Sequence, residues 1–315
     1  MVAPLFSIVT PSFNQGAFLA QTLDSVLTQS AGPIEYFVMD GGSTDASPEI
    51  IQQYSGRLAS WCSERDRGQA HAVNKGWSRS TGRILSFLNS DDYLLPGALA
   101  RVERAFDENP DVGIVYGQAV WVSVDGAWQS ITQIYVDGQS MLDSLSSLPQ
   151  PAAFVRREVV DAVGALDESF QFALDKEFFL RAVGQFKVLA LPEPLACMRL
   201  HGSAKSVRAG GGFAPEVLRI AEKVIAAPGD YPRFAVRPGR VRASAAAVAS
   251  RFHYMAGQQV PALRMLARSC FHDPIGAPRV LIHELPRLAL RTMAGRRVYD
   301  GVSAMARKSE LDSWT

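Results

Sequence analysis

The stretch Leu5–Asn14, with the sequence LFSIVTPSFN, is an apolar run that stops at a proline and a polar turn. Two stretches of the same kind follow it, Tyr36–Asp45 (YFVMDGGSTD) and Ile84–Asp92 (ILSFLNSDD). Each apolar run predicts a buried strand, and each polar end predicts a loop. The segments with helical periodicity between and around these runs are Ala17–Gln29, a stretch beginning at Ser47, and Ala70–Trp77. This alternation predicts an α/β protein whose strands form a parallel sheet with helices on both faces.

The residues beyond the third run extend this pattern and then change character. Val112–Tyr116 predicts another strand, and the pair Asp125-Gly126 between two strand-like stretches is typical of a β-hairpin. Gly210–Gly212 form a break, after which the sequence has helical periodicity without strand alternation. We therefore expect two domains, a sheet domain over 1–207 and a mainly helical C-terminal region over 208–315.

The charge of the chain is nearly zero because two unlike parts cancel. The sequence has 32 Lys or Arg against 31 Asp or Glu, but residues 208–315 have 17 against 8 and residues 1–207 have 15 against 23. Within the basic part, Pro278–Arg297 mixes five arginines with apolar residues. Such a stretch can contact an anionic membrane surface, and the alternative is that basic helices pack on the acidic domain. A nucleic-acid partner is not expected, because interleaved aromatics and a recognised binding motif are missing from the sequence.

Several protein classes are excluded by the sequence. The three cysteines form no CxxC pair, which argues against a disulfide scaffold and a thiolate zinc site and suits a reducing compartment. The sequence has no signal-peptide pattern and no window that approaches ~18 uninterrupted apolar residues. It also lacks the dinucleotide fingerprint G-x-G-x-x-G and the P-loop. We expect a cytoplasmic protein, or one that binds peripherally to the inner face of the cell membrane.

The polar ends of the three apolar runs are the candidate functional residues, Thr10–Asn14, Asp40–Asp45 and Asn89–Asp92. Ligands of an open α/β sheet bind beyond the carboxyl ends of the strands, so the three clusters are expected to face one crevice. The adjacent carboxylates of Asp91 and Asp92 repel each other unless a cation joins them. Oxygen ligands suit Mg²⁺ or Mn²⁺, which also bind phosphate oxygens. The alternative is that each cluster only forms turns and caps, because loops are rich in these residue types.

The order and spacing of further segments extend the pattern beyond the three runs. These segments are Arg67–Gln69, Asn74–Gly76, Gln150–Pro151, Phe154–Arg157, Leu174–Arg181, and a closing loop with Arg199, His201 and Ser206. Together with Phe6–Asn14, Met39–Asp45 and Leu88–Asp92, they resemble the motifs of the family 2 inverting glycosyltransferases. The resemblance covers roughly residues 5–206.

The resemblance implies a GT-A fold, a Rossmann-like mixed sheet with helices on both faces, here with a C-terminal helical extension. It implies an inverting hexosyltransferase that moves a sugar from a nucleotide-diphosphate-sugar donor to a hydroxyl of a glycan or lipid-linked acceptor, in surface polysaccharide or glycolipid biosynthesis. Asp175 has the position of the catalytic base, and Asp91, Asp92 and His201 have positions that bind Mg²⁺ or Mn²⁺. The positions implied for substrate binding are Thr10, Pro11, Asn14, Asp40, Arg67, Gly68, Gln69, Lys75 and Asp91.

Gly41 departs from the family pattern. Many relatives have a second aspartate there that recognises the base, so the resemblance leaves uridine, guanosine and thymidine open.

Two other functions also remain as alternatives. A non-catalytic nucleotide-sugar- or glycan-binding protein is disfavoured because Asp91, Asp92 and Asp175 are all present. A sugar nucleotidyltransferase is disfavoured because Ser12–Gly16 has no Lys or Arg, where that chemistry usually uses a basic glycine-rich loop.

Overall fold

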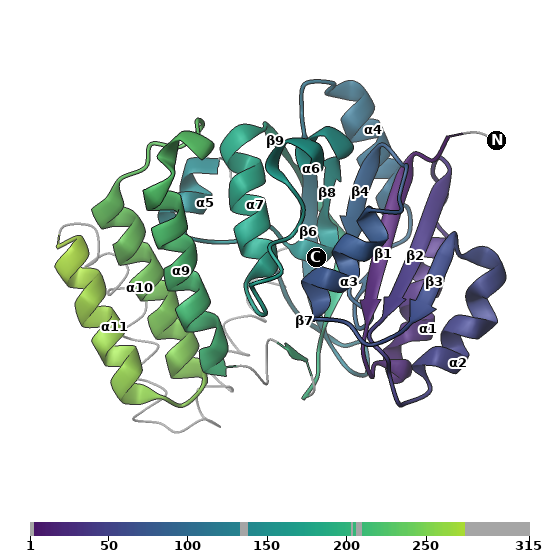
Figure 1. The fold of residues 1–315 in the computed structure, drawn as a ribbon, viewed down its shortest axis with the longest axis horizontal. Helices are drawn as coiled ribbons and strands as arrows, with labels where there is room; N and C mark the ends of the chain where they lie inside the picture. Colours follow the sequence, from purple (N-terminus) through teal and green to yellow (C-terminus); the bar gives the residue numbers. More distant parts are fainter. Residues whose placement is uncertain (1–2, 133–137, 203, 206–209, 275–315) are drawn as a thin grey trace. The chain divides into compact units, whose positions relative to one another are not determined.

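The structure, a computed structural model, describes residues 3–132, 138–202, 204–205 and 210–274 (Figure 1). The predicted basic stretch Pro278–Arg297 and the predicted loop residue Ser206 lie outside the described residues. The chain divides into two compact units. The first is Met1–Leu142, Ser146–Arg208 and Ala227–Ala235, and the second is Asp143–Leu145, Ala209–Ala226 and Val236–Thr315. Within the described ranges, no helix is both long enough and apolar enough to cross a membrane.

The described part of the first unit contains a sheet of nine strands. In chain order these are β1 Phe6–Ser12, β2 Ile34–Asp40, β3 Ser60–Ser63, β4 Ile84–Phe87, β5 Tyr93–Leu94, β6 Ile114–Ser123, β7 Trp128–Ile131, β8 Ala153–Arg156 and β9 Val188–Leu200. Across the sheet the order is β3-β2-β1-β4-β8-β6-β9-β5, and β7 pairs with β6. The β6–β7 hairpin confirms the one predicted at Asp125-Gly126.

The sheet is mixed. Strands β3, β2, β1 and β4 run parallel, as the alternation of strands and helices predicts. Strand β8 then runs antiparallel to both β4 and β6, while β6 and β9 run parallel. The prediction of a parallel sheet is therefore wrong beyond β4, because helical crossovers constrain only the strands that they join. The mixed sheet implied by the resemblance is confirmed.

Helices cover both faces of the sheet, as predicted. The helices up to residue 185 are α1 Gly16–Leu27, α2 Ser47–Tyr54, α3 Gln69–Trp77, α4 Ala98–Glu108, α5 Gly138–Ser144, α6 Arg157–Val163 and α7 Leu174–Gln185. Ile8 of β1 belongs to a core cluster with Leu19 and Leu23 of α1. The next residue, Val9, lies against Gly76 of α3. Because neighbouring strand residues point to opposite faces, α1 and α3 lie on opposite sides of β1.

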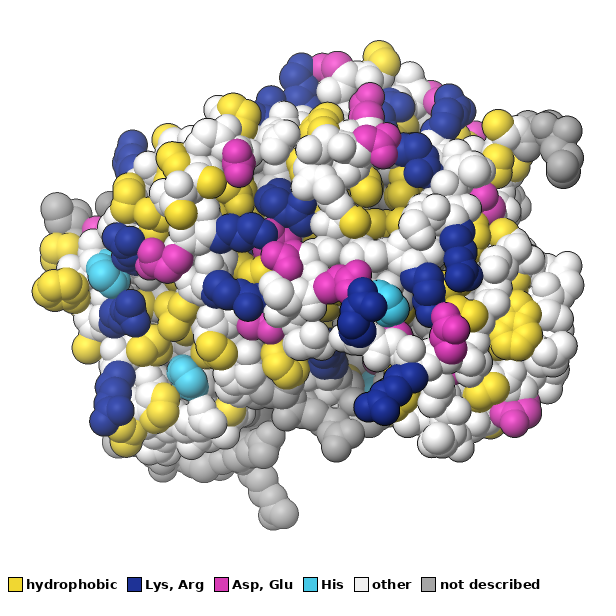
Figure 2. All heavy atoms as spheres, in the orientation of Figure 1, with side chains coloured by type: hydrophobic (Ala, Val, Ile, Leu, Met, Phe, Trp, Pro, Cys, Tyr) yellow, Lys and Arg dark blue, Asp and Glu magenta, His cyan; other side chains and the backbone are white. Residues whose placement is uncertain are grey.

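The second unit is helical over its described residues. It contains α9 Phe213–Ala226, α10 Pro238–Met255 and α11 Gln259–His272, and α10 packs against both of the others (Figure 1). Val217, Ile220 and Val224 form a buried stripe of α9 at helical spacing. From Gly210 to Pro274 the sequence has nine Lys or Arg and four Asp or Glu. Figure 2 shows basic side chains, in dark blue, spread over the surface of these helices.

Glu35 connects the amino-terminal ends of three parallel strands, β1, β2 and β4. Its carboxylate accepts hydrogen bonds from Ser7 Oγ at 2.5 Å, from Gly82 N–H at 2.7 Å and from Thr81 Oγ1 at 3.1 Å. The Thr81 N–H donates to it as well. Burial raises the pKa of Glu35, but these hydrogen bonds outweigh burial and hold the pKa below its ordinary value of 4.5. This contact lies at the end of the strands opposite to the polar clusters.

We expect Glu35→Gln to lower the free energy of unfolding by about 1–2 kcal/mol at pH 7, because Gln loses the charge-assisted hydrogen bonds. A carboxylate whose folded pKa is depressed stabilises the fold above its unfolded pKa, and this contribution is lost as the pH falls through the folded pKa. The difference between wild type and variant should therefore shrink below about pH 4.5. Urea unfolding across a pH series measures the difference, and one that grows on acidification would contradict this account.

Candidate active site

The loops after β1 and β2 are bonded to each other. Asn14 has a left-handed backbone, with φ of 52°, and its N–H donates to Ser43 Oγ at 2.7 Å. Asn14 Oδ1 accepts a hydrogen bond from the Thr44 N–H at 2.9 Å, and the Gly16 N–H donates to Asp45 Oδ2 at 2.8 Å. The first loop is therefore held in place by Ser43, Thr44 and Asp45. These contacts agree with the alternative interpretation, in which the cluster forms a turn.

Thr10, Pro11 and Asp40 are buried at the ends of β1 and β2. The Thr10 hydroxyl shares a hydrogen bond of 2.7 Å with the Tyr36 hydroxyl. The Asp40 carboxylate accepts hydrogen bonds of 2.6–3.1 Å, and the donors are Gly42 N–H, Ser43 N–H, Ser43 Oγ and Ser63 Oγ. A carboxylate with four donors has its lone pairs occupied. The structure thus gives Thr10 and Asp40 a supporting role, and their contact with substrate stays a prediction.

The third cluster brings two carboxylates and a histidine together. Asp91 and Asp92 follow β4, and His201 directly follows β9. Asp91 Oδ2 lies 2.9 Å from His201 Nε2. Asp92 is 6% exposed, and its carboxylate accepts hydrogen bonds from Arg199 N–H at 3.1 Å and from Asn89 Nδ2 at 3.3 Å. Burial and, second, the charge of Asp91 raise the pKa of Asp92 well above its ordinary value.

These residues have the donor chemistry of a divalent-cation site. Carboxylate oxygens suit Mg²⁺ and Mn²⁺, and imidazole is a further ligand for Mn²⁺. Asp91 and Asp92 place two negative charges side by side with little water, a repulsion that a cation would relieve. Among the residues that the structure describes, however, no three His, Cys, Asp or Glu are grouped closely enough to hold a metal ion. A cation at Asp91 and Asp92 would therefore need ligands from a bound substrate.

Gln69 connects the start of α3 to this cluster. Its Nε2 donates to Asn89 Oδ1 at 2.6 Å, and its Oε1 accepts a hydrogen bond from Lys205 Nζ at 3.3 Å. Gly68 has φ of 117°, and a Cβ at this position would lie 2.7 Å from Gln171 Oε1. The positive φ favours glycine at position 68, whereas the end of the Gln171 side chain could move away from a Cβ. The chain before α7 therefore lies directly over the start of α3.

Arg67 and Lys75 form ion pairs outside the cluster. The Arg67 guanidinium donates to Glu168 Oε2 from Nη2 at 2.6 Å and from Nε at 3.1 Å, and its side chain is 69% exposed. Lys75 Nζ lies 2.9 Å from Glu64 Oε1. The structure thus does not place either cation beside Asp91, and their contact with a diphosphate stays a prediction.

Asp175 lies in the first turn of α7, where its Oδ2 accepts a hydrogen bond from Ser147 Oγ at 3.0 Å. The helix is fixed on α3 and β4, because the Phe178 ring lies 5.5 Å from the Trp77 ring, which lies 6.0 Å from Phe87. Strand β4 also leads into the Asp91-Asp92 motif. One packed frame therefore holds the candidate base and the candidate metal ligands.

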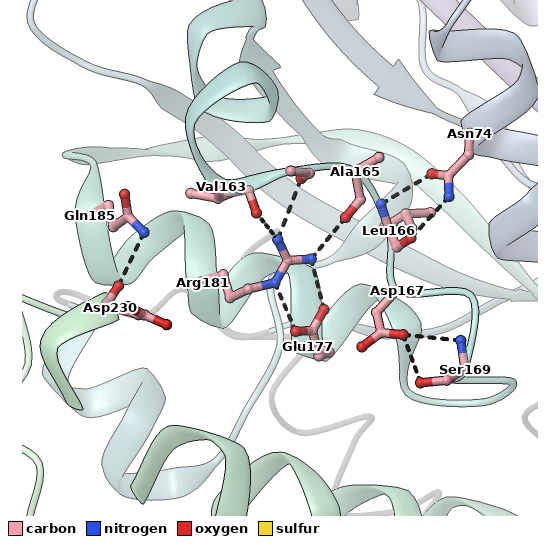
Figure 3. A network of polar contacts seen from close by, with 11 residues as sticks. Asn74, Val163, Ala165, Leu166, Asp167, Ser169, Glu177, Arg181, Gln185 and Asp230 are labelled. Carbon is pink, nitrogen blue, oxygen red and sulfur yellow. Dashed lines mark hydrogen bonds and ion pairs between the residues drawn. The ribbon is translucent and has the colours of Figure 1, made fainter. Parts of the chain in front are cut away.

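The ion pair that fixes the loop before α7 was not predicted from the sequence (Figure 3). Glu177 is 1% exposed and accepts two hydrogen bonds from Arg181, at 2.7 Å and 2.8 Å. Arg181 also donates to the backbone carbonyls of Ala165, at 2.9 Å, and Val163. The i,i+4 spacing of Glu and Arg in a predicted helix was the available signal for this pair. Its effect is to tie α7 to the end of α6.

Asn74 holds the same loop from the other side. Its Nδ2 donates to the Leu166 carbonyl at 2.9 Å, and its Oδ1 accepts from the Leu166 N–H at 3.0 Å (Figure 3). Asn74 Nδ2 also lies 3.2 Å from Glu168 Oε1. An amide that both donates to and accepts from one peptide unit fixes its position like a strand partner. Asn74 thereby couples α3 to the segment that leads to Asp175.

We expect Arg181→Met to lower the free energy of unfolding by about 2–3 kcal/mol, because it leaves the buried Glu177 without this cation. The double variant Arg181→Met/Glu177→Gln should recover part of the loss, since the charge is then removed together with its partner. Urea unfolding of the three proteins measures both effects. A single variant as stable as wild type, or a double variant less stable than the single one, would contradict the role of this pair.

Comparison with known proteins relates this site to a family. The sequence model described as glycosyl transferase family 2 matches residues 7–164. The chain is similar to the PGL/p-HBAD biosynthesis glycosyltransferase of Mycobacterium bovis BCG, with 31% identity over 188 residues, 58% of this chain and 70% of that protein. It is also similar to an uncharacterized glycosyltransferase of Nostoc, with 27% identity over 225 residues, 67% of this chain and 69% of that protein.

Two solved structures have the same fold. S. aureus TarS 1–349 in complex with UDP-GlcNAc aligns with a TM-score of 0.64 and 17% identity, over 99% of this chain and 92% of that one. The mannosyltransferase PcManGT from Pyrobaculum calidifontis, in complex with GDP-Man and Mn²⁺, aligns with a TM-score of 0.59 and 18% identity, over 96% and 85%. The fold is GT-A, and the family model matches half of the chain. The chain therefore belongs to glycosyl transferase family 2.

Proposed function

We propose that this glycosyltransferase moves a sugar from a nucleoside-diphosphate-sugar to a hydroxyl acceptor, with inversion and with Mg²⁺ or Mn²⁺. The observation that carries the proposal is the single packed frame that holds Asp175 and the cluster of Asp91, Asp92 and His201. The solved relatives with UDP-GlcNAc and with GDP-Man and Mn²⁺ support such a donor and cation. The mycobacterial relative, named for PGL/p-HBAD biosynthesis, supports an acceptor from glycolipid or surface polysaccharide synthesis.

In this proposal Asp175 is the general base. Its carboxylate takes the proton of the acceptor hydroxyl while that oxygen forms a bond to the anomeric carbon. The bond from this carbon to the diphosphate oxygen breaks on the opposite face, so the configuration inverts. The hydrogen bond from Ser147 Oγ orients the carboxylate. The first turn of α7 places this carboxylate at the positive end of the helix dipole.

The leaving diphosphate gains negative charge as its bond to the sugar breaks. Asp91 and Asp92 would hold the divalent cation, which when bound neutralises that charge. His201 would become a ligand once its hydrogen bond to Asp91 opens. Asn89 supports Asp92, because its amide donates to Asp92 Oδ2 and, at 2.9 Å, to Gln150 Oε1. Oxygens of the diphosphate would complete the coordination that the protein residues alone leave open.

We further propose that residues 1–207 carry the transferase chemistry and residues 208–315 form a basic helical extension. The proposed location is the cytoplasm, with peripheral contact to the inner face of the membrane through Pro278–Arg297. The arginines and apolar residues of that stretch suit an anionic leaflet. Contact with the membrane would bring the enzyme to a lipid-linked acceptor.

A panel of nucleotide-sugars tests the proposed function. The full-length protein is incubated with each donor, Mn²⁺ and a lipid-linked or glycan acceptor, and nucleoside diphosphate release is scored. NMR of the product then gives the anomeric configuration, which should be opposite to that of the donor. Retention of configuration would overturn the inverting mechanism. Release of pyrophosphate from a nucleoside triphosphate would instead support a nucleotidyltransferase.

A further inference from the structure

A groove lies where the three helices of the second unit meet, and the transferase mechanism does not use it. Helices α9 and α11 both pack on α10 (Figure 1). The groove has a volume of about 240 Å³, and its lining comes from all three helices. Its apolar part includes Ala221 of α9 and Ala245 of α10, whose small side chains leave this space unfilled. The groove can therefore admit a ligand group of the size of a phosphate ester.

The charged side chains that line this groove are mostly basic. They are Arg219 and Glu222 of α9, Arg242 of α10 and Arg268 of α11. Arg242 donates two hydrogen bonds of 2.9 Å to the Glu222 carboxylate, one from Nε and one from Nη2. Among the lining residues, the positive charges thus outnumber the negative one by two. An anion bound in the groove would offset this excess.

His272 reports the positive potential beside the groove. It lies one turn after Arg268 on α11, and Arg268 Nε is 3.5 Å from His272 Nε2. Burial and, second, the charges of Arg268 and Arg242 hold the pKa of His272 below its ordinary value of 6.5, although Glu222 acts in the opposite direction. The same potential that disfavours a proton on His272 favours an anion.

The outward face of α11 has an exposed apolar stripe beside these basic residues. Val260 is 58% exposed, Leu263 60% and Phe271 82%. Together with the exposed Ala267 they recur at helical spacing, and the buried residues of α11 lie on its other face. Phe271 follows Arg268 by three positions, so the two are neighbours on the helix surface. Figure 2 shows apolar side chains, in yellow, beside basic ones, in dark blue, over α11.

The combination of stripe and groove favours one kind of partner. Exposed apolar patches with a charged rim are typical of surfaces that bind proteins or membranes. A membrane accounts for both features, because apolar side chains enter the boundary of the acyl chains while basic ones meet the phosphates. Arginine is particularly suited to phosphate, since its planar guanidinium can donate two parallel hydrogen bonds.

We propose that α11 docks on an anionic phospholipid leaflet. Val260, Leu263 and Phe271 enter the interface, and Arg219 and Arg268 bind a lipid phosphate at the groove, while Arg242 keeps its pair with Glu222. This lipid site goes beyond the proposed function. It is also separate from the membrane contact proposed for Pro278–Arg297, because α11 ends at His272.

Co-sedimentation of the full-length protein with vesicles tests the phosphate site. Wild type should bind vesicles that contain phosphatidylglycerol and not vesicles of phosphatidylcholine alone. Arg219→Gln/Arg268→Gln should weaken this binding about 10- to 30-fold, because two basic side chains near an anionic surface are lost and the Arg242–Glu222 pair is left intact. Arg83→Gln/Arg104→Gln removes two exposed arginines from the first unit and is the matched control. It should bind within about threefold of wild type.

A lysine variant separates a phosphate site from diffuse positive charge. Arg219→Lys/Arg268→Lys keeps both charges and loses the guanidinium geometry, so binding should weaken about threefold or more. Binding equal to that of wild type would overturn the phosphate site. A glutamine variant that binds as tightly as the Arg83→Gln/Arg104→Gln control would overturn it as well.

The apolar stripe is tested by Leu263→Ser/Phe271→Ser, which should weaken vesicle binding at least about tenfold. Val124→Ser/Trp128→Ser removes two exposed apolar side chains from the β6–β7 hairpin and should bind as wild type does. Circular dichroism checks that both variants keep their helices. If wild type bound no vesicle but formed a dimer that Leu263→Ser/Phe271→Ser dissociated, a second copy of the chain would cover the stripe and membrane docking would be wrong.

Two further arms separate this inference from the other proposals. If only Arg287→Gln/Arg291→Gln lost vesicle binding, docking through α11 would be overturned and the contact through Pro278–Arg297 would stand. If calorimetry showed binding of inorganic phosphate by a wild type that bound no vesicle, the groove would be a site for soluble phosphate and lipid docking would be wrong. If wild type bound neither, both membrane proposals would fail. Nucleoside diphosphate release without vesicles decides the transferase assignment independently.

Discussion

Asp175→Asn is expected to slow sugar transfer by about 10²- to 10⁴-fold while nucleoside diphosphate affinity stays within about twofold of wild type. Asparagine keeps the shape of the side chain and can still accept the hydrogen bond from Ser147 Oγ. It cannot take a proton from the acceptor hydroxyl, so only the rate of the chemical step should fall. Single-turnover assays with saturating donor measure the rate, and calorimetry with nucleoside diphosphate measures binding.

The matched control is Asp161→Asn, which removes an exposed carboxylate from α6 and should leave both quantities unchanged. The transfer rate of Ser147→Ala should lie between the rates of Asp161→Asn and Asp175→Asn, because this variant removes only the orienting hydrogen bond. A transfer rate for Asp175→Asn within a few-fold of wild type would place the base elsewhere. Glu177 would not be the replacement, since it is buried and holds Arg181 through both carboxylate oxygens.

The first four parallel strands show why part of the fold could be predicted. β2 and β4 are apolar runs that stop shortly before Gly41 and Asn89, so hydrophobicity and turn residues mark their limits. β1 continues through Pro11 to Ser12, because both residues pair with β2. β9 was not predicted, because Val188–Leu200 contains two prolines and lacks alternation, features that usually argue against a strand. The structure accommodates them through register shifts between β6 and β9. β3, with four residues, is too short to give a pattern.

The site was predictable in its residue types and less so in its contacts. Asp91 and His201 meet, as the resemblance implied, although 110 positions separate them in the chain. The pairing of Arg67 with Glu168 was not predictable, because it joins residues 101 positions apart with no shared motif. Nor could the sequence show that Asp40 is saturated by its own loop, since that depends on where backbone N–H groups point. Partners of side chains follow from the tertiary structure, whereas strand ends follow from local sequence.

The metal requirement is the second prediction with a large effect. Chelation with EDTA should lower turnover at least about 10²-fold, because the charge of the leaving diphosphate then develops without a cation. Excess Mn²⁺ or Mg²⁺ should restore it. Asp92→Ala should behave like the chelated enzyme even with Mn²⁺ present, since it removes the buried carboxylate that follows β4. Initial rates of nucleoside diphosphate release measure all three conditions.

Thermal unfolding separates loss of metal binding from loss of structure. For wild type, Mn²⁺ with nucleoside diphosphate should raise the unfolding temperature, because ligands that bind only the folded state stabilise it. For Asp92→Ala the unfolding temperature should not respond to Mn²⁺, whatever its value without ligand. Asp125→Asn, in the β6–β7 turn, removes an exposed carboxylate and should respond as wild type does. Full turnover in excess chelator would rule out the metal role of Asp91, Asp92 and His201. The negative charge of the leaving group would then have to be neutralised by cationic side chains. Arg67 and Lys75 would need to leave their ion pairs to supply this positive charge.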